Sequence, residues 1–465
     1  MTHDIGDEDV LDGGAEPANH EPVERSRFRR KRDVFLVALI AVVALVVGLL
    51  VWRSSDIRAT TSQTYAGRAT EPALPKTFPP SLGETWRAAS AATPQPVTTK
   101  TTVVTGNGGE VVGRDPLTGE VRWRYSRDLP LCTVSAAWTM AIAVYAKSAN
   151  YLPSDDPRRP GGCSEVTAFD PGTGKRGKPP EPNEHRDKPF GGQRNSDAEL
   201  GTRLLFDGSY VTTTGGELLT TWRSDLVQTM EYGKVPTLVN PDKQPRTGCT
   251  YGSVAVVQGR IAVVERCPQD ATDRLTVYRA TGNNDSEKPE VVASVVLGSK
   301  GARVVAMSDQ CRINAQDEND VQQCTAVVVP NPARLVVLDE KGVQVASHPL
   351  SLAPGDLDGD PAGHVVATTR TPGAVYWFTG SRTIALSLAD LSPLWTVEDA
   401  QGPGTPFAGQ MLVPVGNSLA VLDPTDGKPV GTIPVDRGGY RGPVTMSTLG
   451  PMVYEQRGET LVALR

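Results

Sequence analysis

Asp356, Asp358 and Asp360 are three carboxylates at alternate positions, a spacing that suits a metal ion. Calcium-binding loops use such side chains because hard carboxylate oxygens that converge on one point satisfy Ca²⁺. The best-known loops place Gly directly after the third acid and Glu at the twelfth position. Here Pro361 and Ala367 occupy those places. Two interpretations stay open: a Ca²⁺ site at these three aspartates, or an acidic turn between strands.

Motifs of nucleophilic and metal-assisted hydrolysis are not found. The sequence contains neither Gly-x-Ser-x-Gly nor His-Glu-x-x-His, and the histidines beyond residue 52 (His185, His348 and His364) are far apart. Residues 172–178 match the Gly-x4-Gly-Lys part of a phosphate-binding loop, but Pro179 replaces the Ser or Thr that would hold Mg²⁺. The sequence therefore predicts no catalytic residue and a protein that is not an enzyme.

Six cysteines follow residue 52 and none precedes it. An even number of cysteines in an exported domain indicates disulfides, and a zinc site would need Cys-x2-Cys spacing or nearby histidines. Six cysteines allow 15 pairings. Pairing of nearest neighbours is favoured because each pair then brackets a loop between two strand-like runs. The predicted disulfides are Cys132–Cys163, Cys249–Cys267 and Cys311–Cys324.

Residues 34–52 are uncharged and mostly aliphatic. As a helix they span roughly 28 Å, close to the hydrocarbon core of a bilayer. A cleaved signal peptide is the alternative, but its apolar part is shorter and ends at a small-x-small site, which is not evident here. Six Arg and Lys residues lie in 25–32, and only Arg53 and Arg58 follow soon after. The positive-inside rule thus predicts a single-pass protein of the plasma membrane, with a cytoplasmic N-terminus.

The chain divides into four parts. Residues 1–33 are acidic and then basic, with little to bury, and are expected to be a disordered cytoplasmic tail. Residues 34–52 form the transmembrane helix, which contacts the lipid bilayer. Residues 53–83 are rich in Thr, Ser, Ala and Pro without periodicity, and are expected to be a flexible extracytoplasmic stalk. Residues 84–465 form the folded domain.

The composition of the chain favours an all-β fold. Its 46 Gly and 38 Pro among 465 residues exceed the average usage of about 12%, which excludes a helical bundle. The formal net charge of −6 argues against a nucleic-acid partner.

One unit recurs along residues 84–465: a β run, an Asp-Pro-x-Thr-Gly turn and a second β run. It is clearest at 111–123, 166–174 and 419–427. Pro presets φ early in the turn, Gly supplies positive φ, and Asp and Thr can bond the turn's backbone. Weaker copies are found at 218–228, 275–282, 335–342 and 384–395. Spacings of about 35 to 60 residues are typical of propeller blades.

The pattern Ala-x-Asp-x-x-Thr-Gly-x-x-x-Trp resembles the repeat of quinoprotein-type (PQQ-like) β-propellers. Residues 113–123 match it except for Gly113, residues 168–174 match its first half, and residues 385–395 keep Ala385 and Trp395. With its tail, apolar segment and paired cysteines, the chain resembles uncharacterised single-pass, membrane-anchored propellers of actinobacteria. The resemblance covers 84–465 and implies an eight-bladed propeller, with seven blades as the alternative.

The last of the eight predicted hairpins lacks an outer strand. Residues 84–89 are expected to supply it and close the ring, with Trp86 placed like Trp123 and Trp395. These tryptophans are interpreted as packing between blades rather than as ligand-stacking residues.

PQQ-dependent dehydrogenases of this fold carry a general-base Asp, acidic Ca²⁺ ligands, a Trp beneath the cofactor and, in some, a disulfide between adjacent cysteines. The resemblance places none of these on a residue of this chain. No cofactor is therefore expected, apart from the Ca²⁺ weighed at the three aspartates, and a PQQ-dependent dehydrogenase is the least favoured alternative.

Two long polar loops, 147–162 and 175–199, are expected on the second blade. Long loops on a rigid scaffold often bind partners, although tolerated surface insertions look the same. The residue types that anchor interfaces are Tyr151, Arg158, Arg159, His185, Arg186 and Phe190. The sequence thus favours a non-catalytic scaffold or binding module for cell-envelope proteins. A sensor that binds a small ligand or glycan at the propeller's central mouth is the alternative.

Overall fold

The computed structural model describes residues 30–53, 58–146, 162–177, 191–235, 243–282, 288–312 and 321–465. They belong to two compact units, Met1–Arg58 and Ala59–Arg465. The first unit contains one helix, α1 (Arg30–Arg53), which begins four residues before the predicted 34–52 span and ends one after it. Within α1, Lys31–Arg53 is long and apolar enough to cross a membrane.

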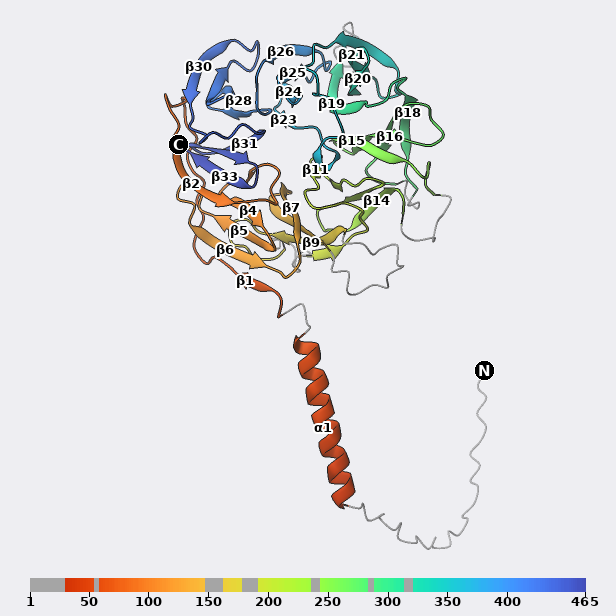
Figure 1. Cartoon of the computed structure of the whole chain (residues 1–465), viewed down its shortest axis with the longest axis vertical. Coiled ribbons are helices and arrows are strands. Elements are labelled where there is room, and N and C mark those ends of the chain that lie inside the picture. The colour runs from red at the N-terminus through yellow and green to blue at the C-terminus, as the bar shows by residue number, and fades with distance from the viewer. Residues whose placement is uncertain are drawn as a thin grey trace, which may run out of the picture. The chain divides into compact units, whose positions relative to one another are not determined.

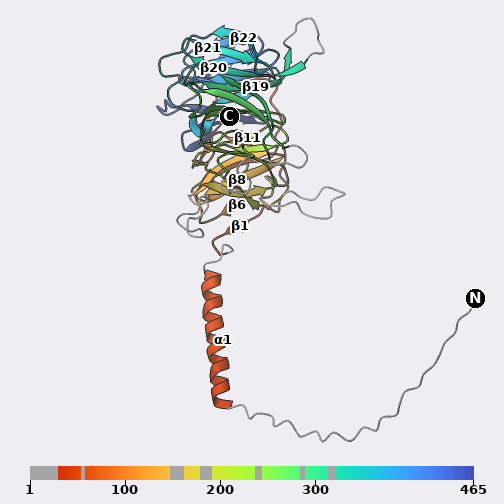
Figure 2. The same cartoon turned by 90° about the vertical axis from the view of Figure 1, so that its right-hand side faces the viewer.

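The second unit is an eight-bladed β-propeller (Figure 1). Its eight antiparallel sheets are arranged around a central axis, and Figure 2 shows the ring from its side. The expected eight blades are confirmed, and the seven-bladed alternative is wrong. Blade 1 has five strands, ordered outward as β3 (Val97–Thr98), β4 (Val103–Asn107), β5 (Glu110–Arg114), β6 (Val121–Ser126) and β1 (Thr61–Gln63).

The other blades have four strands each, and the innermost comes first in the following lists. Blade 2 contains β7 (Leu131–Ala137), β8 (Met140–Ala146), β9 (Cys163–Phe169) and β10 (Gly191–Gln193). Blade 3 contains β11 (Leu204–Phe206), β12 (Val211–Thr213), β13 (Leu218–Trp222) and β14 (Gln228–Gly233). Blade 4 contains β15 (Thr250–Val257), β16 (Arg260–Arg266), β17 (Arg274–Arg279) and β18 (Val291–Val296).

Blade 5 contains β19 (Arg303–Arg312), β20 (Val321–Pro330), β21 (Ala333–Leu338) and β22 (Gln344–Pro349). Blade 6 follows the short 3₁₀ helix η2 (Ala362–His364) and contains β23 (Thr368–Arg370), β24 (Ala374–Phe378), β25 (Thr383–Ser387) and β26 (Pro393–Val397). Blade 7 contains β27 (Thr405–Phe407), β28 (Gln410–Val415), β29 (Ser418–Leu422) and β30 (Pro429–Pro434). Blade 8 contains β31 (Val444–Leu449), β32 (Met452–Arg457), β33 (Thr460–Leu464) and β2 (Glu84–Ala89).

The ring closes as the sequence predicted. The N-terminal strand β2 pairs antiparallel with the C-terminal strand β33, from Glu84 opposite Leu464 to Ala89 opposite Thr460. Gly83 and Arg465 extend this pairing with two backbone hydrogen bonds of 2.9 Å. Both ends of the propeller are thereby held in one blade, so the ring has no free end at which blades can peel away.

The hydrophobic core lies between blades. Eight clusters of buried side chains each join two neighbouring blades, and together they run around the ring. The middle strands are covered on both faces, so they are near-continuous apolar runs, and every residue of β8 is buried. The outer strand β22 instead has no fully buried residue, and four of its six residues are exposed. The pattern of apolar and polar residues in a strand therefore depends on the strand's distance from the propeller axis.

Each Asp-Pro-x-Thr-Gly turn joins two strands of one blade and packs against the neighbouring blade. In the turn of blade 2, the Asp170 carboxylate accepts hydrogen bonds from the backbone N–H and hydroxyl of Thr173, at 2.8 and 2.6 Å. Gly174 has φ +72°, and a Cβ there would meet the Trp123 ring of blade 1 at 2.5 Å. Residues 172–174 therefore form a turn that packs against the neighbouring blade. Their match to a phosphate-binding loop is only superficial.

The same arrangement recurs twice. A Cβ on Gly119 would lie 2.6 Å from the ring of Trp86, and a Cβ on Gly427 would lie 2.5 Å from the ring of Trp395. The structure therefore confirms that these tryptophans pack between blades.

The segment 58–83 does not form the expected stalk. Residues 61–63 form β1 and pair with β6 as a fifth strand of blade 1. Leu82 is buried with the cluster between blades 7 and 8, and Phe78 packs against that cluster. A few isolated apolar side chains hold this segment, and such contacts leave no periodic signal in the sequence.

All three predicted disulfides are present, and they account for every cysteine. Cys132–Cys163 joins β7 to β9 within blade 2. Cys249–Cys267 lies in blade 4, and Cys311–Cys324 joins β19 to β20 in blade 5.

Candidate functional site

The three aspartates proposed as a Ca²⁺ site lie in a long connection between blades 5 and 6. We call residues 351–367 the strap, because they leave β22 and reach blade 3 before they enter β23 (Figure 1). The Thr214 hydroxyl of blade 3 donates a 2.6 Å hydrogen bond to the carbonyl oxygen of Gly363. A shorter segment would be enough to join two neighbouring blades, so the longer path of the strap affects a part of the ring outside blades 5 and 6.

The aspartates hold the strap in place and do not converge on one point. The Asp356 carboxylate accepts hydrogen bonds from the hydroxyls of Thr379 and Ser381, at 2.9 and 3.0 Å. The Asp360 carboxylate accepts two hydrogen bonds from Arg266 of blade 4, at 2.6 and 2.7 Å.

Main-chain oxygens of the strap are also occupied. Arg303, at the start of β19, donates to the carbonyl oxygens of Asp356, Asp358 and Gly359, at 2.9, 3.1 and 2.8 Å. Within the described ranges no group of three or more His, Cys, Asp or Glu side chains is arranged to hold a metal ion. The carboxylates of Asp356 and Asp360 thus already accept from hydroxyl and arginine donors, and Asp358 is held through its main-chain oxygen, so the three residues are not arranged as a Ca²⁺ site.

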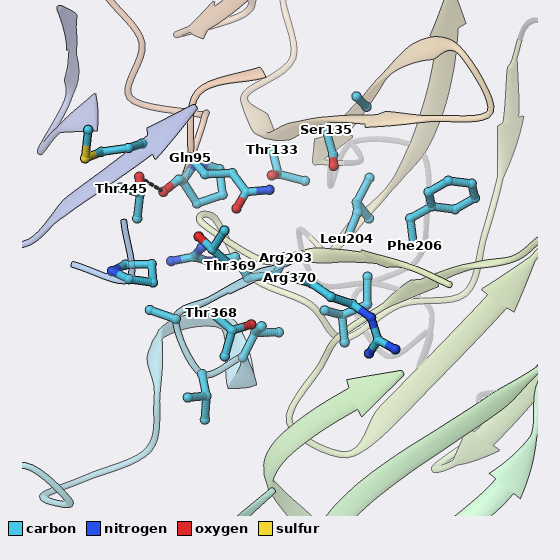
Figure 3. A pocket seen from close by; sticks show the side chains of 18 of the residues that line it. Gln95, Thr133, Ser135, Arg203, Leu204, Phe206, Thr368, Thr369, Arg370 and Thr445 are labelled. Atoms are coloured by element: carbon cyan, nitrogen blue, oxygen red, sulfur yellow. Dashed lines mark hydrogen bonds between the residues drawn. The ribbon is translucent and has the colours of Figure 1, made fainter. Parts of the chain in front are cut away.

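A cavity of about 300 Å³ lies at the inner side of the ring (Figure 3). Its walls come from the innermost strands β7, β11, β23 and β31 and from residues just before β3 and β27, so six of the eight blades contribute. Blades 4 and 5 do not line it. Residues 365–367 of the strap form part of the wall, so the strap takes the place of those two blades.

Two arginines enter this cavity from different blades. Arg203 immediately precedes β11, and Arg370 is the last residue of β23. The Arg203 guanidinium forms no ion pair with a described residue, and its buried Nε has no hydrogen-bond partner. Arg370 donates to the carbonyl oxygen of Met307 at 2.7 Å and approaches the exposed Asp309 at 3.4 Å.

Burial lowers the pKa of both guanidinium groups below the ordinary value, and for Arg370 the charge of Asp309 opposes the shift. None of the described residues that line the cavity is an Asp or a Glu. The cavity therefore carries two positive charges and no lining carboxylate.

Hydroxyl and amide groups complete the polar wall: Gln95, Thr133, Ser135, Thr368, Thr369 and Thr445. Two of these hydroxyls are used internally, since Thr445 donates to Pro94 at 3.0 Å and Thr369 donates to Gly404 at 2.7 Å. Thr133 is fully buried, yet its hydroxyl oxygen has no hydrogen-bond partner. The cavity thus offers hydrogen-bonding groups that the protein itself does not satisfy.

A second hollow, of about 330 Å³, lies where the strap meets blade 3. Asp197 and His364 both line it. One Asp197 carboxylate oxygen accepts the backbone N–H groups of Glu217 and Leu218, at 2.6 and 3.1 Å. The other oxygen is buried without a partner, as is Nδ1 of His364. Burial raises the pKa of the Asp197 carboxyl above its ordinary value, and the backbone N–H donors oppose this shift.

The loops expected to bind partners are only partly described. Tyr151, Arg158, Arg159, His185, Arg186 and Phe190 lie outside the described residues. The predicted loop 175–199 was too long, because Gly191–Gln193 forms β10 and pairs with β9. The Ala198 carbonyl oxygen also accepts a hydrogen bond from the N–H of Cys163, so residues near 198 belong to blade 2.

Sequence reasoning missed Arg203 and Arg370. Neither lies in a recognisable motif, and the innermost strands next to them are only three residues long.

No protein-family model and no curated protein matches the chain. Among solved structures it is similar to BamB from Moraxella catarrhalis, with 12% identity over 83% of this chain and 99% of that chain, and a TM-score of 0.46. It is also similar to Sqt1 from Saccharomyces cerevisiae, with 9% identity, 86% and 98% coverage, and a TM-score of 0.47. A third similar structure is the dihydro-heme d1 dehydrogenase NirN, with 10% identity, 82% and 78% coverage, and a TM-score of 0.46. At such low identity these structures carry no argument about what the chain binds.

Proposed function

We propose that this chain is a non-catalytic, membrane-anchored binding module that acts as a scaffold for cell-envelope proteins. The observation that carries the proposal is the combination, in one chain, of the apolar helix α1 and a closed propeller with three disulfides. A closed ring with cores between all its blades is a rigid frame, and its loops are free to vary for binding.

The membrane anchor is argued from length and charge. The candidate span within α1, Lys31–Arg53, contains 23 residues, and its uncharged part, 34–52, is about 28 Å long at 1.5 Å per residue, close to the hydrocarbon core of a bilayer. Basic residues are concentrated at 25–32, before the apolar stretch. This asymmetry favours a cytoplasmic N-terminus and a propeller outside the plasma membrane.

The disulfides support the same orientation. They form and persist in oxidising compartments and are rare in the cytosol. All six cysteines follow α1 in the chain, so disulfides in the propeller and a cytoplasmic N-terminus are mutually consistent.

The partner surface is proposed to be the pair of loops in blade 2, within residues 147–161 and 178–190. Their aromatic and arginine residues are of the kinds that dominate protein interfaces. Blade 2 keeps its own disulfide and strand pairing outside these two ranges, so the loops can be shortened without removing a described strand.

The test is cross-linking in cells followed by mass spectrometry, with the full tagged chain. Variants replace 148–160 or 179–189 by short Gly-Ser linkers, and a matched control replaces 237–241. Capture of the same few envelope proteins by the wild type and the control, but not by the loop variants, supports the scaffold. Capture that does not depend on these loops contradicts the assignment of the surface.

Two other functions make different predictions. A sensor of a small ligand or glycan, which the central cavity favours, would lose its output when residues 1–24 are deleted, whereas an external scaffold would keep its partners. A PQQ-dependent dehydrogenase would reduce an artificial electron acceptor when supplied with PQQ, Ca²⁺ and alcohols or sugars. Absence of turnover over a broad substrate panel would remove that alternative.

A further inference from the structure

We propose that the central cavity binds a small anion, whose carboxylate or phosphate group lies between Arg203 and Arg370. This site is separate from the proposed partner loops and does not depend on the scaffold function.

The charge of the cavity is the first argument. Two guanidinium groups line it, and no Asp or Glu is among its described lining residues. A buried charge without a partner is unfavourable, and carboxylates and phosphates match the planar fork of arginine with two parallel hydrogen bonds. An anion in the cavity would supply Arg203 with the ion-pair partner that no described residue provides, and would add a second partner for Arg370, which already approaches Asp309.

Two other arginines of this propeller differ from Arg203 in their partners. Arg437 is fully buried and forms a 2.7 Å ion pair with the equally buried Glu455. Arg303 donates to three carbonyl oxygens of the strap. The fold therefore provides acceptors for these two arginines, whereas the buried Nε of Arg203 has none and Arg203 lines the cavity.

A second, independent observation comes from Thr133, on β7 of blade 2. It is fully buried and lines the same cavity, and its hydroxyl oxygen has no partner. Buried polar groups are normally hydrogen-bonded, so an unsatisfied one on a cavity wall indicates a missing ligand atom or water. Gln95 and Ser135 lie on the same wall and can bind further oxygens of the ligand (Figure 3).

The strap prepares the site. A Cβ on Gly363 would lie 2.7 Å from Cγ of Arg203, so the bare backbone of the strap packs directly on the arginine side chain. Thr214 fixes this part of the strap through its hydrogen bond to Gly363. Arg203 is thus held by packing before any ligand arrives, which reduces the entropy lost on binding.

The size of the cavity sets the class of ligand. About 300 Å³ is at the lower end of small-molecule sites, so the ligand is a small polar metabolite rather than a polymer or a large cofactor. Suitable probes are inorganic phosphate, glucose 6-phosphate and citrate. Glucose serves as the neutral control for the sugar phosphate.

The experiment is calorimetric titration of the full chain in detergent with each of the four probes. We expect one anionic probe to bind at one site per chain, more weakly at high salt, and glucose not to bind. Citrate alone would identify a carboxylate ligand, and phosphate or glucose 6-phosphate alone would identify a phosphate ligand. Failure of all three anions overturns the proposal.

Variants test the residues. Arg203→Met and Arg370→Met should each weaken binding by about tenfold to a hundredfold, and Thr133→Val by about twofold to tenfold. Arg203→Lys should lose less than Arg203→Met because it keeps the charge. The control is Arg223→Met in the same blade, since Arg223 is 54% exposed and pairs with Asp225 of its own turn.

Stability without ligand separates binding from folding. Because the Arg203 charge is unpaired, Arg203→Met should keep or raise the melting temperature while it loses the anion-dependent increase. A marked fall in melting temperature for both Arg203→Met and Arg203→Lys would show that Arg203 serves the fold, and would overturn the proposal. Anion binding that is unchanged in Arg203→Met, Arg370→Met and Thr133→Val would also overturn the proposal.

Discussion

The indole N–H of Trp123 donates a 2.7 Å hydrogen bond to the carbonyl oxygen of Pro171, across the boundary between blades 1 and 2. Pro171 belongs to the Asp-Pro-x-Thr-Gly turn of the next blade, and the ring of Trp123 lies on Gly174 of the same turn. Trp86 and Trp395 donate to Pro116 and Pro424 in the same way, at 3.2 and 3.3 Å. The turn and the tryptophan of the repeat are therefore two halves of one contact between neighbouring blades.

This contact predicts a graded loss of stability. Trp123 is 1% exposed, so Trp123→Ala should lower the free energy of unfolding by about 3–5 kcal/mol through the cavity it leaves. Trp123→Phe should cost less, about 1–3 kcal/mol, chiefly by leaving the Pro171 carbonyl without its donor. Denaturant unfolding of the full chain measures both. Trp395→Phe is the control, and its cost should be smaller because Trp395 is only partly buried. Equal costs at the two sites would contradict this account.

Glu455 carries a second prediction. Its buried carboxylate receives Arg437 at 2.7 Å and Arg457 at 2.7 Å, and the side chains of Glu455 and Arg437 are both 0% exposed. Glu455→Gln should destabilise the propeller by about 3–5 kcal/mol, because it leaves two buried guanidinium groups without their counter-charge.

The matched control for Glu455 is Glu84→Gln. Glu84 pairs with Arg87, whose side chain is 64% exposed, so solvent screens the pair and the substitution should have little effect. Thermal unfolding of the two variants should separate them clearly. Similar melting temperatures would show that burial does not strengthen the Glu455 pairs.

Asp197 predicts a pH dependence. Burial raises the pKa of its carboxyl, so the folded state holds this proton to a higher pH than the unfolded state does. The stability contributed by the protonated form is complete below the ordinary aspartate pKa of about 3.9 and is lost as pH rises through the raised pKa.

The experiment on Asp197 compares two pH profiles. Asp197→Asn cannot titrate, so its stability relative to the wild type should improve as pH rises through that window. Melting temperatures measured from pH 3.5 to 7 provide the test. Parallel profiles for the two proteins would show that Asp197 titrates normally.

The disulfides should rank by the length of the loop they close. Cys132 and Cys163 are 31 residues apart, and Cys311 and Cys324 are 13 apart. Replacing both cysteines of a pair by Ser should cost about 4 kcal/mol for the longer loop and about 3 kcal/mol for the shorter one, from chain entropy in the unfolded state. Denaturant unfolding under non-reducing conditions measures the order. A reversed order would mean that the entropy of the unfolded chain does not dominate the contribution of these disulfides to stability.

Local chemistry explains why so much of the fold was predictable. Asp170, Thr173 and Gly174 form their turn through contacts within five residues, so their spacing alone identified the repeat. Repeats counted along the chain then predicted eight blades and the pairing of β2 with β33. The disulfide pairs were favoured because neighbouring cysteines that bracket one loop between two strands lie close together in a blade.

Non-local contacts explain what was missed. Residues 53–83 were expected to be a flexible stalk, but in the described part from residue 58 onward scattered side chains such as Leu82 hold the chain on the ring. For Asp356, Asp358 and Asp360 the sequence left a Ca²⁺ site and an acidic turn open, and it did not reveal that Thr379 and Arg266, distant in the sequence, are the partners of Asp356 and Asp360. Partners of this kind have no fixed spacing, so no motif reveals them.

The sequence by itself determined the apolar helix and the recurring unit of strand, turn and strand, because each is a pattern within a short stretch of chain. It favoured eight blades, closure of the ring by residues 84–89 and pairing of neighbouring cysteines, and the structure decided each of these. Only the tertiary structure decided that the strap crosses to blade 3 and that Arg203 and Arg370 share one cavity. The physical reason is that a closed ring brings the inner strands of all its blades together at one axis. Residues far apart in the chain become neighbours there, and the geometry of closure alone sets which ones meet.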